Sequence, residues 1–114
     1  MKYLLAAAGS LRQLDPALTA QRPLKLLVYQ VIASSEQIPS YQWDSLKMLR
    51  ELGFPVTSEA ALLPDIESTV QYCVSWVSKR AALSFEIDGM VIKLNDLRLS
   101  NSLGFVGKDP RGAI

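Results

Sequence analysis

Residues 85–93, which read Phe-Glu-Ile-Asp-Gly-Met-Val-Ile-Lys, constrain the fold of this chain most, because they place charged groups inside an apolar, β-prone run. In an extended strand, Glu86 and Asp88 lie on one face and Lys93 on the other, so neither face is a simple solvent face. The residues alone leave two interpretations open. The run is an edge strand with solvated ends, or it is a phosphate site in which Gly89 lets a ligand approach the backbone and Lys93 meets phosphate oxygens.

Length and composition indicate one globular domain. With 114 residues, 49% of them hydrophobic and 20% charged, the chain can bury a core. The net charge of +1 argues against a free-standing nucleic-acid binder, although residues 1–30 and 79–114 each carry a positive excess. Cys73 is the single cysteine and histidine is absent, so a metal site would have to rest on carboxylates. We predict no metal site within this chain and a reducing, cytoplasmic setting.

The opening residues superficially resemble an export signal. Their apolar run is short, however, and the polar residues from Ser10 to Asp15 follow at once, so we expect a helix here instead. No segment reaches the ~20 apolar residues that a transmembrane helix needs.

Three segments carry apolar residues at helical spacing. The first, residues 4–14, must end before Pro16. The second, residues 41–52, is followed by Gly53 as a helix C-cap. The third, residues 64–80, begins at a proline and has acids in its first turn.

Two segments are expected to be strands: residues 24–32, a short apolar run, and residues 85–94, which contain the charged motif. Residues 95–103 form a turn or short helix that Gly104 ends, and residues 105–114 form a loop leading to a final strand. Because helices and strands do not alternate strictly, we predict an α+β fold, with a mainly antiparallel sheet packed with helices, rather than a parallel doubly wound sheet.

The motif EIDGMVIK, from Glu86 to Lys93, resembles nucleotidyltransferase motif IV of the bacterial NAD-dependent DNA ligases, whose typical form is EIDGVVIK. Three blocks agree with the same family in order and spacing: AAAGSLRQLDP from Ala6, RPLKLLVYQV from Arg22 and LRELGFPV from Leu49. The tail from Asn95 resembles the family's continuation toward a last motif like AYKFP. The resemblance implies one partial domain over residues 1–114, the latter part of the ligase adenylation domain.

In activity, the resemblance implies the sealing of nicks in duplex DNA through AMP-lysine and AMP-DNA intermediates, in DNA replication and repair. NAD would be the AMP donor, and magnesium would assist. The family's nucleophile is a lysine in a Lys-x-Asp-Gly motif, and the chain contains neither that motif nor an OB-fold. We therefore expect a ligase as the parent enzyme and an inactive chain in isolation.

Lys93 is the leading candidate for a catalytic and cofactor-binding residue. A lysine that ends a strand is usually just solvated, but the resemblance implies that Lys93 contacts the AMP phosphate and offsets its charge under attack. Asp88 precedes a glycine, as acids in turns often do, and the resemblance places it close to the nick.

Arg12 and Arg80 are the candidates for DNA contact. Arg12 is by default an exposed helical arginine, and Arg80 is favoured at a helix C-terminus by the helix dipole; the resemblance implies that both bind nick phosphates. Trp43, Trp76 and Tyr72 could stack a base, but their helical spacing indicates core positions.

The implied partner is nicked duplex DNA, with no membrane. Self-association is also possible, through an uncovered sheet edge or apolar face. A function from another class stays open: a non-catalytic α+β interaction module that keeps the ligase scaffold.

Overall fold

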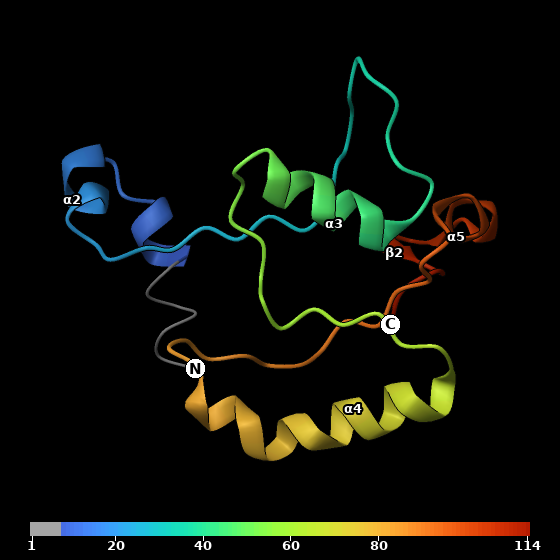
Figure 1. The fold of residues 1–114 in the computed structure, drawn as a ribbon. Helices are drawn as coiled ribbons and strands as arrows, with labels where there is room; N and C mark the ends of the chain where they lie inside the picture. The colour runs from blue at the N-terminus through green and yellow to red at the C-terminus, as the bar shows by residue number, and fades with distance from the viewer. Residues whose placement is uncertain (1–7) are drawn as a thin grey trace. The chain divides into compact units, whose positions relative to one another are not determined.

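A computed structural model describes residues 8–114 of the chain (Figure 1). The described part consists of helices joined by long irregular segments, with one short hairpin. It divides into two compact units: residues 8–26 with Val70–Met90, and Leu27–Thr69 with Val91–Ile114. We call them unit 1 and unit 2. In the part that the structure describes, no helix is long and apolar enough to cross a membrane.

Helix α3, Gln42–Glu51, lies in unit 2 and follows the expected helix over residues 41–52. Leu46 and Leu49 are each 7% exposed and Ser45 is 1% exposed, so one face of α3 supplies the core of the unit. The helix ends as predicted: Gly53 has φ 85°, a conformation that costs glycine little, and Phe54 N–H donates to the Leu49 carbonyl at 2.9 Å.

Helix α4, Ile66–Lys79, matches the third expected helix and continues into η1, a 3₁₀ turn at Arg80–Ala82. Asp65 precedes it and caps it, because the Ser68 N–H donates to Asp65 Oδ1 at 2.7 Å. Trp76, buried at 7% exposure, confirms that this aromatic residue is a core residue. Another face of α4 is apolar but exposed, and comprises Ile66, Val70, Val74 and Val77.

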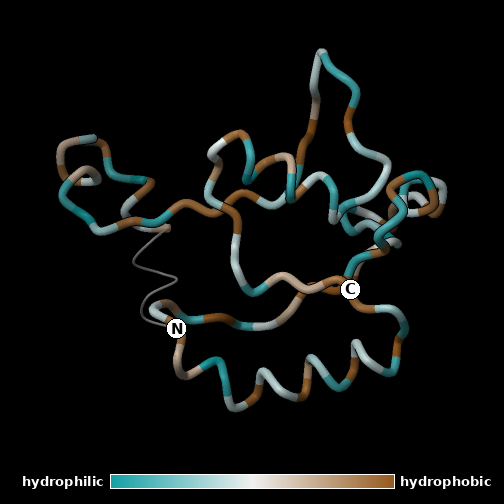
Figure 2. The backbone as a smooth tube through the Cα atoms, viewed as in Figure 1, coloured by the Kyte–Doolittle hydropathy of each residue, from teal (hydrophilic) through white to brown (hydrophobic). Residues whose placement is uncertain are grey.

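The expected antiparallel sheet is largely absent from the described residues. Regular strands occur at β1, Phe105–Val106, and β2, Asp109–Pro110, which pair antiparallel across Gly107. Residues 24–32 and 85–94, both expected to be strands, are irregular apart from one bridge at Lys93. A strand needs a ladder of backbone partners, and the first segment has a single such bond to another part of the chain, from Val28 N–H to the Pro55 carbonyl at 2.8 Å. Figure 2 accordingly shows hydrophobic stretches along irregular segments as well as along the helices.

Near the N-terminus, residues 8–11 are helical; the earlier part of the helix expected over residues 4–14 lies outside the described residues. Pro16 does not merely follow a helix, as expected, but starts one: α2, Pro16–Ala20. Its fixed φ suits the first helical position, and Asp15 Oδ1 accepts a bond from Ala17 N–H at 2.9 Å.

Helix α5, Leu97–Leu103, realises the short-helix alternative for residues 95–103, and Gly104 ends it at φ 70°. Asp96 caps α5 by accepting from the N–H groups of Arg98 and Leu99. Gly112 packs tightly against α5: a Cβ at this position would lie 2.8 Å from Ser100 Cβ.

Candidate phosphate-binding site

The backbone around Lys93 is fixed by the last residues of the chain. Ile92 N–H donates to the Ile114 carbonyl at 2.8 Å, and the Ile92 carbonyl accepts from Ile114 N–H at 2.9 Å. Leu94 N–H donates to the Gly112 carbonyl at 2.9 Å. Lys93 itself forms an antiparallel bridge with Ala113. These bonds fix where the side chain of Lys93 leaves the backbone.

The ammonium of Lys93 lies over the ring of Tyr29, with Nζ 4.5 Å from the ring centroid. This is close enough for a cation–π interaction. Lys93 is half-buried, and desolvation by burial lowers its pKa from the ordinary value of 10.5. The ion pairs of the described residues include Lys47 with Asp44 and Arg98 with Asp96, and none of them joins Lys93 to a carboxylate of residues 8–114.

Tyr29 belongs to residues 24–32, which the sequence predicts as a strand, and it is not among the predicted site residues. It is 63% exposed, and its carbonyl accepts a bond from Gln42 Nε2 at 2.7 Å. An aromatic residue in an apolar run gives no sequence signal that a lysine so far along the chain will lie on its ring. Only the tertiary structure reveals this pairing.

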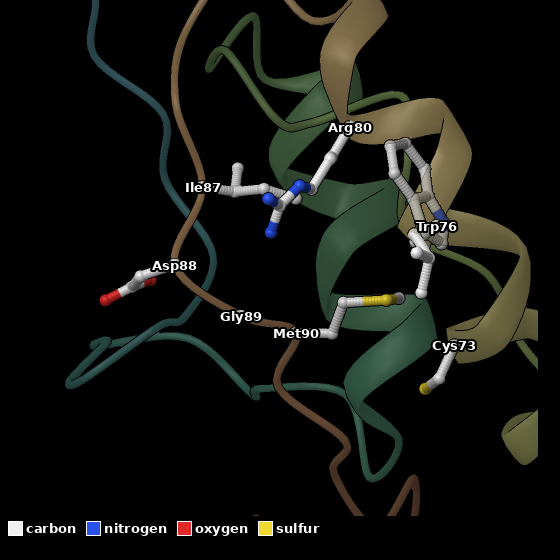
Figure 3. A pocket seen from close by; sticks show the side chains of 8 residues that line it. Cys73, Trp76, Arg80, Ile87, Asp88, Gly89 and Met90 are labelled. Carbon is white, nitrogen blue, oxygen red and sulfur yellow. The ribbon is translucent and has the colours of Figure 1, made fainter. Parts of the chain in front are cut away.

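Arg80 and Asp88 are brought together in unit 1, where both line a cavity of about 330 Å³. Cys73, Trp76 and Met90 are among its other lining residues. In Figure 3 the guanidinium of Arg80 points from the end of α4 toward the segment that holds Ile87 and Gly89, whereas the Asp88 carboxylate points away from Arg80. The cavity therefore has one cationic lining residue, Arg80, among mainly apolar ones such as Trp76 and Met90.

The four predicted site residues do not form one cluster that the structure defines. Arg80 and Asp88 line the cavity in unit 1, and Lys93 belongs to unit 2. Arg12 lies in the turn after the helical residues 8–11 and is exposed. Trp43, a predicted core residue, is half-buried in α3 under Arg50, whose Cζ is 5.8 Å from the ring centroid.

The side chains near Lys93 fit a phosphate better than a metal ion. An ammonium with no carboxylate partner retains its hydrogen-bond donors and its charge for an anionic oxygen. The described residues contain no group of three or more acidic or cysteine side chains placed to hold a metal ion.

The sequence profile of the NAD-dependent DNA ligase adenylation domain matches residues 5–114. The DNA ligase of Herpetosiphon aurantiacus is 47% identical over 109 residues, which are 96% of this chain and 16% of that protein. The DNA ligase of Halothermothrix orenii is 50% identical over 109 residues, again 96% of this chain and 16% of the relative. The chain thus spans about a sixth of the length of these curated relatives.

Proposed function

Because this chain belongs to the family of NAD-dependent DNA ligase adenylation domains, we propose that it is part of an enzyme that seals nicks in duplex DNA. Within that enzyme, Lys93 contacts the phosphate of the transferred AMP. The proposal rests mainly on one observation, the half-buried ammonium of Lys93, which lies on the Tyr29 ring with no carboxylate partner among residues 8–114.

In the proposed reaction, a lysine outside the motifs of this chain attacks the α-phosphorus of NAD, and the bond to nicotinamide mononucleotide breaks. The AMP then passes to the 5′-phosphate of the nick, and the 3′-hydroxyl displaces it as the DNA backbone closes. Each step places extra negative charge on phosphate oxygens. The ammonium of Lys93 donates to these oxygens and stabilises the charge as it develops.

The remaining predicted residues act on the DNA in this proposal. Arg80 and Arg12 contact phosphates beside the nick, because guanidinium groups bind phosphate through two parallel donors. Asp88 lies close to the nick. Magnesium assists the reaction, although residues 8–114 hold no group of three or more acidic or cysteine side chains placed to bind it. The setting of the enzyme is cytoplasmic, in DNA replication and repair.

The decisive experiment replaces the matching segment of the Herpetosiphon aurantiacus ligase with residues 5–114 of this chain and measures nick sealing and adenylation. Lys93→Ala in this chimera should slow adenylation by about 10²–10³-fold, the cost of removing one charge-stabilising donor. Lys108→Ala, at the exposed hairpin between β1 and β2, is the matched control and should leave the rate unchanged.

Near-normal turnover of the Lys93→Ala chimera would contradict the proposed role of the lysine. A chimera that folds, as judged by its circular dichroism and melting, yet seals no nicks would favour the alternative, a non-catalytic α+β interaction module.

A further inference from the structure

We infer that Tyr29 is a positioning residue for Lys93, whose ammonium it holds over one face of its ring. The inference rests on the proposed function only for its effect on turnover. The contact itself can be tested in this chain without any ligand.

The contact has the geometry of a directed interaction. Nζ of Lys93 is 4.5 Å from the ring centroid of Tyr29, whereas the cations over Trp43, Tyr72 and Trp76 are 5.8 to 5.9 Å from theirs. Attraction to a ring face operates within about 6 Å and is stronger when the cation is partly desolvated. The half-burial of Lys93 meets that condition.

Both partners are held at the start of α3. Gln42 Nε2 donates to the carbonyl of Tyr29 at 2.7 Å, and Gln42 N–H donates to the carbonyl of Asn95 at 2.8 Å. Gln42 therefore binds the segment of Tyr29 through its side chain and the segment after Lys93 through its backbone. The distance between the segment of Tyr29 and the segment of Lys93 is therefore set by the bonds of Gln42, independently of the contact between the two side chains.

The choice of a ring instead of a carboxylate matters for a phosphate-binding lysine. A carboxylate partner would compete with the phosphate for the ammonium and neutralise its charge. An aromatic ring orients the ammonium but carries no charge, and it leaves the N–H donors of the ammonium available to phosphate oxygens. Tyr29 thus fixes the direction of Lys93 while its charge stays available.

Nuclear magnetic resonance of the full chain with labelled lysine tests the contact. The ε-methylene protons of Lys93 should resonate upfield, because they lie over the ring, and should show nuclear Overhauser contacts to the Tyr29 ring. Tyr29→Phe should keep both signals and Tyr29→Leu should lose both. Tyr72→Leu is the matched control: it should leave Lys93 unchanged and affect Lys79, which lies over the Tyr72 ring.

The fold of unit 2 is monitored in a second, uniformly nitrogen-labelled sample by the amide of Trp43, which donates to Asn95 Oδ1. Ordinary ε-methylene shifts in the unaltered chain, or upfield shifts that persist in Tyr29→Leu, would overturn the inference.

In the ligase chimera, Tyr29→Leu keeps an apolar side chain but removes the ring face and should reduce adenylation, whereas Tyr29→Phe keeps the ring face and should retain it. Equal rates for Tyr29→Leu and the unaltered chimera would overturn the positioning role. If the unaltered chimera seals no nicks, the proposed function fails, and the resonance measurements alone decide whether Tyr29 holds Lys93.

Discussion

Asn95 caps helix α3 from 52 positions away along the chain, because Trp43 N–H donates to Asn95 Oδ1 at 2.9 Å. The N-cap residue itself, Tyr41, makes no side-chain cap. A side chain just after Lys93 therefore does the work that a local Ser, Thr or Asp does in most helices. The stability of α3 and the placement of Lys93 are coupled at Asn95, whose side chain accepts from Trp43 N–H and whose carbonyl accepts from Gln42 N–H.

Replacement of Asn95 by alanine should therefore destabilise unit 2. Loss of an N-cap costs about 1 kcal/mol of unfolding free energy, within a usual range of roughly 0.5–2 kcal/mol, and urea denaturation measures it. Asn95→Asp keeps an acceptor oxygen and should retain most of the stability. Equal midpoints for Asn95→Ala and the unaltered chain would show that the long-range cap contributes nothing.

Gly112→Ala should destabilise the chain by overpacking. The new Cβ would lie 2.8 Å from Ser100 Cβ and 3.0 Å from Ser100 Cα in α5. The Gly112 backbone cannot withdraw freely, because its carbonyl accepts from Leu94 N–H. We expect a cost of about 1–3 kcal/mol in thermal or urea unfolding. Gly89→Ala is the control, since nothing lies within 4 Å of its added Cβ. Equal losses in the two variants would contradict the packing argument.

The helix cap at Asp65 should make the helicity of α4 depend on pH. The backbone N–H of Ser68, followed by its side chain, bonds to the carboxylate and lowers the pKa of Asp65 below its ordinary value of 3.8. A lowered folded-state pKa means that the stabilisation is present above pH 3.8 and is lost as the pH falls through the folded pKa. Circular dichroism at 222 nm should follow this loss.

Two variants separate the cap from its charge. Asp65→Ala should lower helicity at neutral pH, whereas Asp65→Asn should keep the cap and lose the acid dependence of this position. An unchanged acid transition in Asp65→Asn would assign that transition to other carboxylates.

We predict that the chain alone forms no covalent adduct with AMP. Lys93 belongs to the phosphate-contact motif in the proposed function, and the Lys-x-Asp-Gly nucleophile motif does not occur among the 114 residues. Incubation with NAD labelled in its adenylate, followed by denaturing electrophoresis, should leave the chain unlabelled. A labelled band would place a nucleophile within this chain and overturn the assignment.

The exposed apolar face of α4 should drive self-association. Ile66, Val70, Val74 and Val77 are 72%, 53%, 65% and 76% exposed and recur at helical spacing, so together they form one apolar stripe. Light scattering should show a mass that rises with concentration, and Val74→Lys should reduce the rise. Gln71→Lys, exposed on the same helix but off the stripe, should not. A monomeric mass at every concentration would exclude this face as a contact surface.

Local signals in the sequence predicted α3 and α4, and gave α5 as one of two alternatives, but they missed α2 and wrongly indicated strands over residues 24–32 and 85–94. Gly53 and Gly104 mark the ends of α3 and α5 because their positive φ values are local properties of glycine. Residues 24–32 have the composition of a strand, but composition does not supply backbone partners, and a single bond from Val28 to Pro55 does not make a ladder.

The candidate site also contains both residues that a local motif predicts and residues that only tertiary contacts reveal. Lys93 was identified through its motif, whereas Tyr29 and Asn95 act through contacts that no local pattern encodes.

The two tryptophans stand in different compact units, Trp43 in unit 2 and the buried Trp76 in unit 1. The chain therefore carries one tryptophan in each unit. In either single variant, Trp43→Phe or Trp76→Phe, the tryptophan fluorescence that remains reports on one unit. The order in which the two units lose structure can therefore be recorded without any added label.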